Sequence, residues 1–138
     1  MPNPVIERKS LDSPDETRSF ENGKADIVHL GDVTVGRMTY QPGWSWSKSV
    51  KPIVKTESCQ VHHVGYTVSG RIKVVMNDGK EAEFGPGDAF VVPPGHDAWI
   101  VGNEPWVGLD FAGMKQHAKP KATAKKAKKK AKKKARRR

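Results

Sequence analysis

The sequence contains a single cysteine, Cys59, so the chain cannot form a disulfide bond within itself. Scarcity of cysteine is typical of proteins from a reducing compartment. No apolar run approaches the roughly 20 residues that a membrane helix needs. The first ten residues, MPNPVIERKS, also lack the apolar core of a secretory signal. These absences predict a soluble cytoplasmic protein with no membrane span.

Acidic residues are missing from one end of the chain. Between Lys115 and Arg138 there are 14 lysines and arginines and no acid, whereas residues 1–114 hold the other 11 basic residues and all 15 acidic ones. A mildly acidic body therefore carries a strongly basic appendage, a split that the overall charge of +10 conceals. We divide the chain into a polar N-terminal arm (1–24), a folded domain (25–114) and a tail (115–138).

The folded domain has the pattern of an all-β protein. Short segments rich in Val, Ile, Tyr, Phe and Trp run from Ala25 to about Ala112, and Gly, Pro, Asn and Asp separate them. Several short strands with regularly spaced turn residues indicate a β-sandwich or barrel. Asp78-Gly79 is typical of a tight hairpin turn. The arm is polar and contains several prolines, so we expect it to be extended with at most one short turn.

Two stretches of this domain resemble the cupin superfamily. In GPGDAFVVPPGHDAW, Gly87, Pro93 and Gly95 have the spacing of the second cupin motif, and HHVGYTVSG resembles the end of the first. The resemblance covers roughly residues 26–111. It implies a single-domain cupin jelly-roll barrel of antiparallel strands, which agrees with the strand pattern.

The resemblance also implies a metal site, but the family's ligand types are not in their usual places. Where the family has two histidines and a glutamate, this sequence has Glu57, Cys59 and His63, and the last ligand position is Ala98, with His96 two residues earlier. Alternation along a strand would put residues 57, 59 and 63 on one face. A carboxylate, a thiolate and two imidazoles suit Zn²⁺ or Fe²⁺. Loss of a metal site would produce the same changes, so a metal-free pocket or core is the alternative, and the one we favour.

Two tryptophans, Trp44 and Trp46, share a face if their segment is extended. They would either line the mouth of a small-molecule pocket or fill the barrel core. His62 has the opposite parity to His63 and should face away from the interior. The residues predicted to bind a small molecule are Trp44, Trp46, His63 and His96.

The tail consists mainly of lysine and alanine, which bury too little surface to offset the entropy of ordering, so we expect it to be disordered in the free protein. It resembles the Lys/Ala-rich tails of linker histones. Closely spaced cations bind the DNA or RNA backbone without reading sequence, and the tail has no aromatic residue for base stacking. An anionic membrane surface, another polyanion or a purely solubilising role are the alternatives. The predicted phosphate-contacting residues are Lys125, Lys126, Lys128, Lys129, Lys130, Lys132, Lys133, Lys134, Arg136, Arg137 and Arg138.

Three functions are compatible with these features. The favoured one is a small-molecule-binding or regulatory module, tethered to nucleic acid by its tail and so associated with the nucleoid. The second is a metal-dependent cupin enzyme of oxygenase or isomerase type, and the third is a ligand-free structural module that dimerises. A homodimer is a reasonable expectation for any of them. No catalytic residue is assigned, and the sequence leans away from an enzyme.

Overall fold

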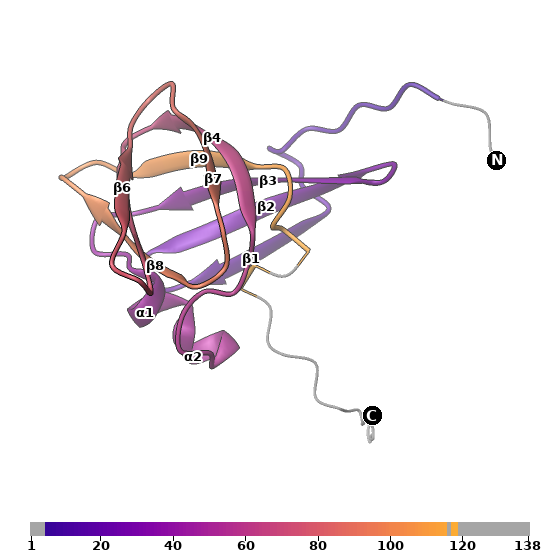
Figure 1. Cartoon of the computed structure of the whole chain (residues 1–138). Coiled ribbons are helices and arrows are strands. Elements are labelled where there is room, and N and C mark those ends of the chain that lie inside the picture. The colour runs from indigo at the N-terminus through magenta and orange to yellow at the C-terminus, as the bar shows by residue number, and fades with distance from the viewer. Residues whose placement is uncertain (1–4, 116, 119–138) are drawn as a thin grey trace, which may run out of the picture.

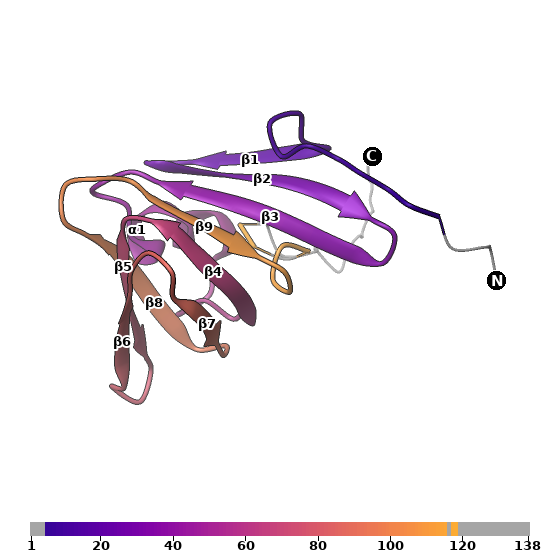
Figure 2. The same ribbon diagram turned by 90° about the horizontal axis from the view of Figure 1, so that it is seen from above.

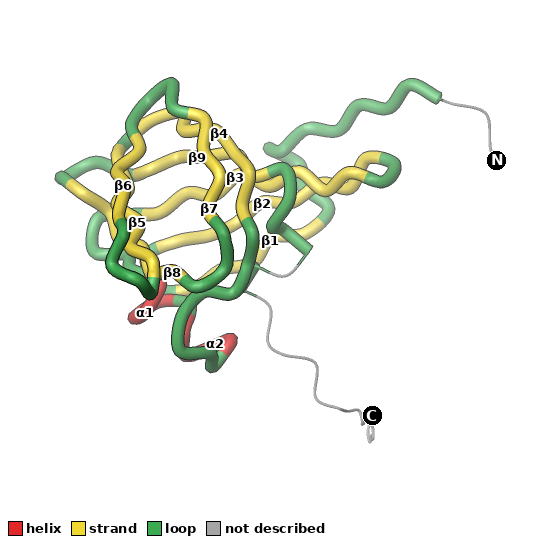
Figure 3. The backbone as a smooth tube through the Cα atoms, in the orientation of Figure 1, coloured by secondary structure: helices red, strands yellow, loops and turns green. Residues whose placement is uncertain are grey.

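The computed structural model describes residues 5–115, 117 and 118. Within them, nine β-strands account for most of the ordered structure, and two one-turn helices lie between the third and fourth strands (Figure 3). The elements are β1 (Glu16–Phe20), β2 (Gly23–Leu30), β3 (Val33–Tyr40), α1 (Trp46–Ser49), α2 (Lys51–Val54), β4 (His63–Ser69), β5 (Arg71–Met76), β6 (Glu81–Phe84), β7 (Ala89–Val92), β8 (His96–Val101) and β9 (Trp106–Asp110).

The strands form two antiparallel sheets. One has six strands in the order β1-β2-β3-β9-β4-β7, and the other has three in the order β6-β5-β8. Figures 1 and 2 show the sheets curving around a common interior, with α1 and α2 at one end of the barrel. In the six-stranded sheet the consecutive strands β3 and β4 are not adjacent, because β9 lies between them. This order brings residues that are far apart in the sequence to the same wall of the barrel.

Alternating side chains explain why these segments form strands. In β3 every second residue from Thr34 to Tyr40 is buried, and β9 buries Trp106, Gly108 and Asp110 in the same way. Such alternation is expected of strands with one face on a core and the other facing solvent. The β5–β6 hairpin turns at Gly79, which has a φ of +92°, as the Asp-Gly signal predicts. The all-β prediction is confirmed.

Aromatic rings fill much of the barrel interior. Tyr40 is stacked between two tryptophans, with ring centroids 3.9 Å from Trp44 and 5.4 Å from Trp106. Phe84 and Phe90 stack with centroids 4.9 Å apart, which joins the two sheets. Burial of such large rings supplies much of the hydrophobic stabilisation in a domain of this size.

The N-terminal arm differs from its expectation, because part of it is a strand. Glu16–Phe20 forms β1 and pairs in register with β2 along its whole length. The only large apolar side chain in β1 is Phe20, which packs on Tyr40 with ring centroids 5.9 Å apart. One apolar residue in five is too weak a pattern to predict a strand, and pairing with β2 decides the conformation here.

The start of the predicted tail also belongs to the body. His117 is 2% exposed and Ala118 is 7% exposed, and they follow Met114, the last residue of the predicted domain, which is 0% exposed. Arg18 on β1 holds this segment, since its Nη1 donates to the carbonyl oxygens of Met114 at 2.7 Å and His117 at 2.6 Å. The cationic residues predicted to contact phosphates lie outside the described residues. Neither helix of the described chain has the length and apolarity needed to cross a bilayer.

Candidate metal centre and ligand cavity

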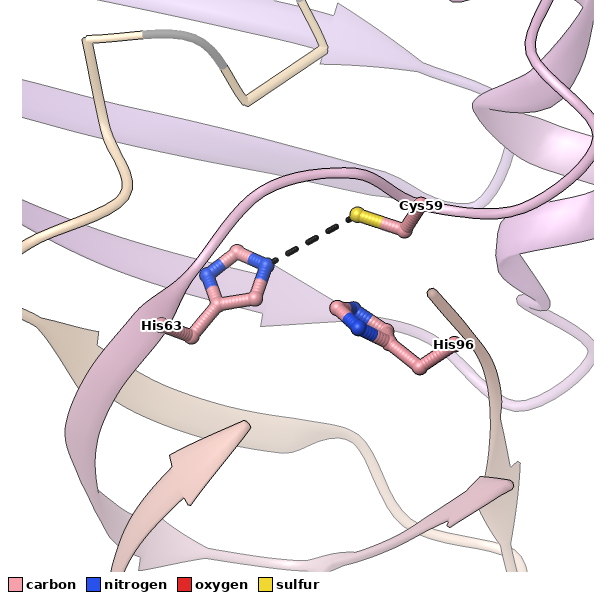
Figure 4. A group of neighbouring side chains, drawn as sticks. All are labelled: Cys59, His63 and His96. Carbon is pink, nitrogen blue, oxygen red and sulfur yellow. Dashed lines mark hydrogen bonds between the residues drawn. The ribbon is translucent and has the colours of Figure 1, made fainter. Parts of the chain in front are cut away.

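Three buried side chains bring metal-binding atoms together inside the barrel. Cys59, His63 and His96 each offer one such atom, and these atoms all lie within 4.8 Å of one another. Figure 4 shows the thiol and the two imidazoles pointing toward one another, with Cys59 and His63 on one continuous stretch of chain and His96 on another. The Cys59 sulfur lies 3.9 Å from His63 Nε2. Cys59, His63 and His96 are three of the four residues that the sequence named as candidate metal ligands, the fourth being Glu57.

The backbone places Cys59 directly beside His96. The two residues form an isolated antiparallel bridge, in which Cys59 N donates to His96 O at 2.7 Å and Gly95 N donates to Cys59 O at 2.7 Å. Gly95 has a φ of +94°, a conformation that residues with a Cβ rarely adopt, and it turns the chain into β8 at His96. His63 begins β4 in the other sheet. The site therefore joins the two sheets at one end of the barrel.

Each imidazole has its Nδ1 committed to an oxygen of the protein. His63 Nδ1 donates to Asp110 Oδ2, and His96 Nδ1 donates to the carbonyl oxygen of Pro93 at 2.7 Å. A carbonyl oxygen can only accept, so His96 carries a hydrogen on Nδ1, which leaves Nε2 as the ring nitrogen able to ligate a metal. Second partners of this kind are typical of histidines that ligate metals, because they fix the tautomer and the ring orientation.

Asp110 is itself firmly held. It is 0% exposed, and its Oδ1 accepts hydrogen bonds from the backbone N–H groups of Ala112 at 2.8 Å and Gly113 at 2.7 Å. A Cβ on Gly113 would lie 2.7 Å from His63 Nδ1 and 2.8 Å from Asp110 Oδ2, so the turn after β9 needs glycine there. The carboxylate thus reaches His63 from a rigid position on β9.

Proximity of the thiol and the imidazoles changes their acidity. Burial opposes ionisation of Cys59, but hydrogen bonds with His63 and His96 outweigh it and lower the pKa of the thiol to about 6. Burial also opposes protonation of His63, yet its hydrogen bonds with Asp110 and Cys59 raise its pKa to about 9. Near neutral pH the metal-free site therefore holds a thiolate beside an imidazolium. The thiolate is the form of cysteine that binds metals.

An aromatic-lined cavity adjoins the three donor side chains. Its walls include all three of them, and the free volume open to the centre of a water molecule is about 40 Å³. By the usual allowance of ~10–15 Å³ for each water, this is room for roughly three water molecules. A ligand of a few heavy atoms fits such a space. The aromatic residues in the walls are Tyr40, Trp44, Trp46, Phe84, Phe90 and Trp106.

The structure does not bring every predicted site residue to this place. Trp44 and Trp46 are buried and line the cavity, although Trp46 begins α1 and does not continue a strand. Glu57 is not part of the cluster, because its side chain is fully exposed and lies 3.9 Å from Lys51. Strand alternation fails there, since β4 begins only at His63. His62 is exposed, as its parity predicts.

Two residues of the site, Asp110 and His117, were missed. Asp110 shares the parity of Trp106 and Gly108 in β9, and an acid on the buried face of a strand is a signal that could have been used. His117 lines the cavity, and its Nε2 lies 2.8 Å from Tyr40 Oη. Its position within a lysine-rich segment gave no indication of burial. Burial lowers the pKa of His117 to about 3, so this imidazole is neutral.

Comparison with known proteins agrees with the architecture. The family model of the EutQ-like cupin domain matches residues 35–107, and no curated protein matches the chain. Among solved structures, a Streptomyces resistomycificus polyketide cyclase, RemF, has 16% identity and a TM-score of 0.57, with 79% of this chain and 80% of that one covered. A cupin sugar phosphate isomerase from Silicibacter pomeroyi has 18% identity and a TM-score of 0.56, covering 78% and 75%.

A third similar structure is the formate complex of Lactobacillus farciminis oxalate decarboxylase, with 24% identity and a TM-score of 0.52. The alignment covers 71% of this chain but only 31% of the decarboxylase, so this chain spans about a third of that protein. At these identities the likeness shows a shared fold alone. The jelly-roll barrel that the sequence predicted is confirmed.

Proposed function

The chain belongs to the EutQ-like cupin family, and from that premise we propose that its barrel binds one divalent transition-metal ion and holds a small ligand beside it. Cys59, His63 and His96 would ligate the ion. The observation that carries this proposal is the convergence of three donor atoms whose imidazoles are already oriented by Asp110 and by the carbonyl oxygen of Pro93.

The donor set fits a metal ion with an open coordination position. One thiolate and two imidazoles are ligands that Zn²⁺ and Fe²⁺ both accept, and sulfur favours the softer Zn²⁺. Three protein ligands are typical of sites that leave a position free, whereas structural zinc sites use four. Within the described residues the group has three members. We therefore expect the free position to face the cavity.

Each part of the chain has a distinct role in this proposal. Asp110 orients His63 so that Nε2 faces Cys59, and the carbonyl oxygen of Pro93 fixes the ring of His96. The aromatic walls keep bulk water out and strengthen electrostatic interactions inside. When bound, the ion would act as a Lewis acid on an oxygen of the ligand. The similar structures named above carry out unlike reactions, so we propose binding of a small ligand and assign no reaction.

Cobalt substitution tests the proposal sharply, because Cys59 is the only cysteine in the chain. A thiolate-to-cobalt charge-transfer band on adding Co²⁺ can therefore come from Cys59 alone. We expect one Co²⁺ or Zn²⁺ per chain, loss of the band in Cys59→Ser, and loss of tight binding in His63→Ala. His62→Ala is the matched control, since His62 is exposed and should leave binding unchanged. A metal-free protein that takes up no Co²⁺ or Zn²⁺ would refute the proposal.

We further propose that the tail tethers this barrel to nucleic acid. The support is the charge of the sequence: after Ala118 come 13 of the 25 basic residues and no acidic one. Such a polycation releases counterions from the phosphate backbone, and log K should fall with log salt with a slope of about −0.9 for each phosphate engaged. Binding should be independent of base sequence, because the tail offers nothing that reads base edges.

The test compares the full chain with a chain ending at Ala118, on random-sequence duplex DNA and on single-stranded RNA at several salt concentrations. Ending at Ala118 leaves the buried residues Met114, His117 and Ala118 in place. We expect the full chain to bind with a steep salt dependence and the shorter chain to bind weakly at every salt concentration. Equal affinities of the two chains would exclude the tether.

A further inference from the structure

Two buried nitrogen atoms in residues lining the cavity have no hydrogen-bond partner among residues 5–115, 117 and 118. They are Trp44 Nε1 and His117 Nδ1, on side chains that are 3% and 2% exposed. By contrast, Trp106 Nε1 in the same cavity wall donates to Thr67 Oγ1 at 3.3 Å. Buried polar groups are nearly always paired, so an unpaired one calls for an explanation. Ser49 Oγ is also unpaired, but Ser49 does not line the cavity.

The two side chains belong to one connected group around Tyr40. Trp44 stacks on Tyr40 with the ring planes 9° apart, and Tyr40 Oη lies 2.8 Å from His117 Nε2. His117 in turn lies edge-on to His63, with ring centroids 5.6 Å apart. The unpaired nitrogens are therefore linked by direct contacts to a residue of the candidate metal centre.

The contacts also indicate that His117 Nδ1 carries a hydrogen. Burial raises the pKa of Tyr40 well above its usual value, so the phenol keeps its proton. The phenol makes its hydrogen bond with His117 Nε2. If Tyr40 donates this bond, His117 Nδ1 bears the hydrogen and is the only group of the pair left unpaired. If His117 donates it, both the phenol proton and Nδ1 lack a partner among the described residues. The first tautomer leaves fewer buried groups unsatisfied.

We propose that Trp44 Nε1–H and His117 Nδ1–H are the donors that bind a small organic ligand through its carbonyl or carboxylate oxygens. Indole nitrogen can only donate, so an acceptor is the group that Trp44 selects. The cavity, with room for roughly three waters, limits the ligand to about the size of acetate or acetamide. This inference names the ligand chemistry of the cavity in the proposed function and rests on that role, but it does not require a bound metal.

The experiment follows the indole N–H signals of the full-length ¹⁵N-labelled protein by NMR, with and without chelator. Four tryptophans give four indole signals, and Trp44→Phe identifies the one from Trp44. Acetate and acetamide are the probes, and isopropylammonium, which has a similar shape but only donors, is the control. We expect acetate or acetamide to shift the Trp44 signal saturably and to leave the signal of exposed Trp99 in place. Whichever of acetate and acetamide binds more tightly shows whether the site prefers an anionic or a neutral acceptor.

Two substitutions test His117 separately from Trp44. His117→Gln keeps an amide that can reach Tyr40 but removes the donor at Nδ1, whereas His117→Asn keeps a donor near Nδ1. We expect the glutamine variant to bind the better probe about tenfold more weakly, as loss of one hydrogen bond predicts, and the asparagine variant to lie closer to the unchanged protein. The opposite order of the two variants would overturn the assignment of His117.

An unshifted Trp44 signal with both acceptors, or an equal shift with isopropylammonium, would overturn the inference as a whole. These results are distinct from failure of the metal proposal. A protein that takes up no cobalt but shifts its Trp44 signal keeps the ligand site and loses the metal. A protein that binds cobalt without any Trp44 shift, metal-free or loaded, keeps the metal and loses the ligand donors.

Discussion

At the residue scale, Asp110 controls the charge of His63. Its hydrogen bond and its negative charge outweigh the effect of burial, which alone would lower the pKa of His63. Asp110→Asn keeps the shape of the side chain and removes the charge. We expect the pKa of His63 to fall from about 9 by about 1 to 3, measured from the ring signals in an NMR pH titration of the metal-free protein. Asp97→Asn is the control, because Asp97 pairs with the backbone of Ser47 and Ala98 and should leave His63 unchanged.

The thiolate and the imidazolium have opposite effects on how stability depends on pH. His63 has a folded pKa of about 9 against 6.5 in the unfolded chain, so its contribution is complete below 6.5 and is lost as pH rises through 9. Cys59 has a folded pKa of about 6 against 9.0, so its contribution is complete above 9.0 and is lost as pH falls through 6. Between about 6.5 and 9 the folded pair and the unfolded chain bind the same number of protons. In this range the two residues together therefore leave the free energy of unfolding independent of pH.

Cys59→Ser removes one half of this balance. In the variant, only the contribution of His63 to stability still depends on pH in this range, and it decreases as pH rises. Loss of the thiolate also lowers the folded pKa of His63, so this decrease ends at a lower pH. Relative to the unchanged protein, the free energy of unfolding of the variant should decrease as pH rises from 6.5, by up to about 1.4 kcal/mol per pH unit. Urea denaturation of both metal-free proteins at several pH values measures the difference. If the free energy of unfolding of the variant, relative to that of the unchanged protein, stays constant or increases as pH rises, the thiolate–imidazolium pair is contradicted.

At the scale of elements, strand β1 and the segment after β9 stabilise each other through Arg18. Its side chain is 9% exposed, pairs with Glu16, and donates from Nη1 to two carbonyl oxygens of the C-terminal segment. Arg18→Ala leaves those carbonyl oxygens without this donor and should cost about 2–3 kcal/mol. It should also speed hydrogen exchange of the His117 amide, which donates to Gly113 O. Arg71→Ala, which breaks an exposed pair with Glu83, should cost no more than about 1 kcal/mol.

Elements with strong local patterns were predictable, and those that depend on distant partners were not. Alternation in β3 and β9 and the turn at Gly79 follow from residues close in sequence. Cys59 and His63 were named as candidate ligands because they occupy ligand positions of the family motif, although their residue types differ from the family's. The exposed Glu57 shows that alternation cannot be extended beyond the end of a regular strand. Asp110 reaches His63 across 47 residues, through the pairing of β4 with β9. No local pattern specifies that register.

At the scale of the whole molecule, the boundary between the acidic body and the basic tail lies later than charge alone suggests. The change in composition predicts a boundary after Met114, yet His117 pairs with Tyr40 and lies edge-on to Phe20 at 5.9 Å. Ala118 is buried as well, at 7% exposed. Packing therefore extends the body at least as far as Ala118.

Two shortened chains distinguish these boundaries. A chain ending at Met114 loses buried Ala118 and the His117 imidazole, which lines the cavity and pairs with the buried Tyr40 hydroxyl. Loss of a buried hydrogen bond with one partner retained, together with the lost burial, should cost about 2–4 kcal/mol. A chain ending at Ala118 keeps His117 and Ala118, and its free energy of unfolding should lie within about 0.5 kcal/mol of that of the full chain. Urea denaturation in moderate salt, which screens attraction between tail and body, gives the comparison. Equal stability of the two shortened chains would mean that His117 contributes nothing to the body, and the charge boundary would then be the structural one.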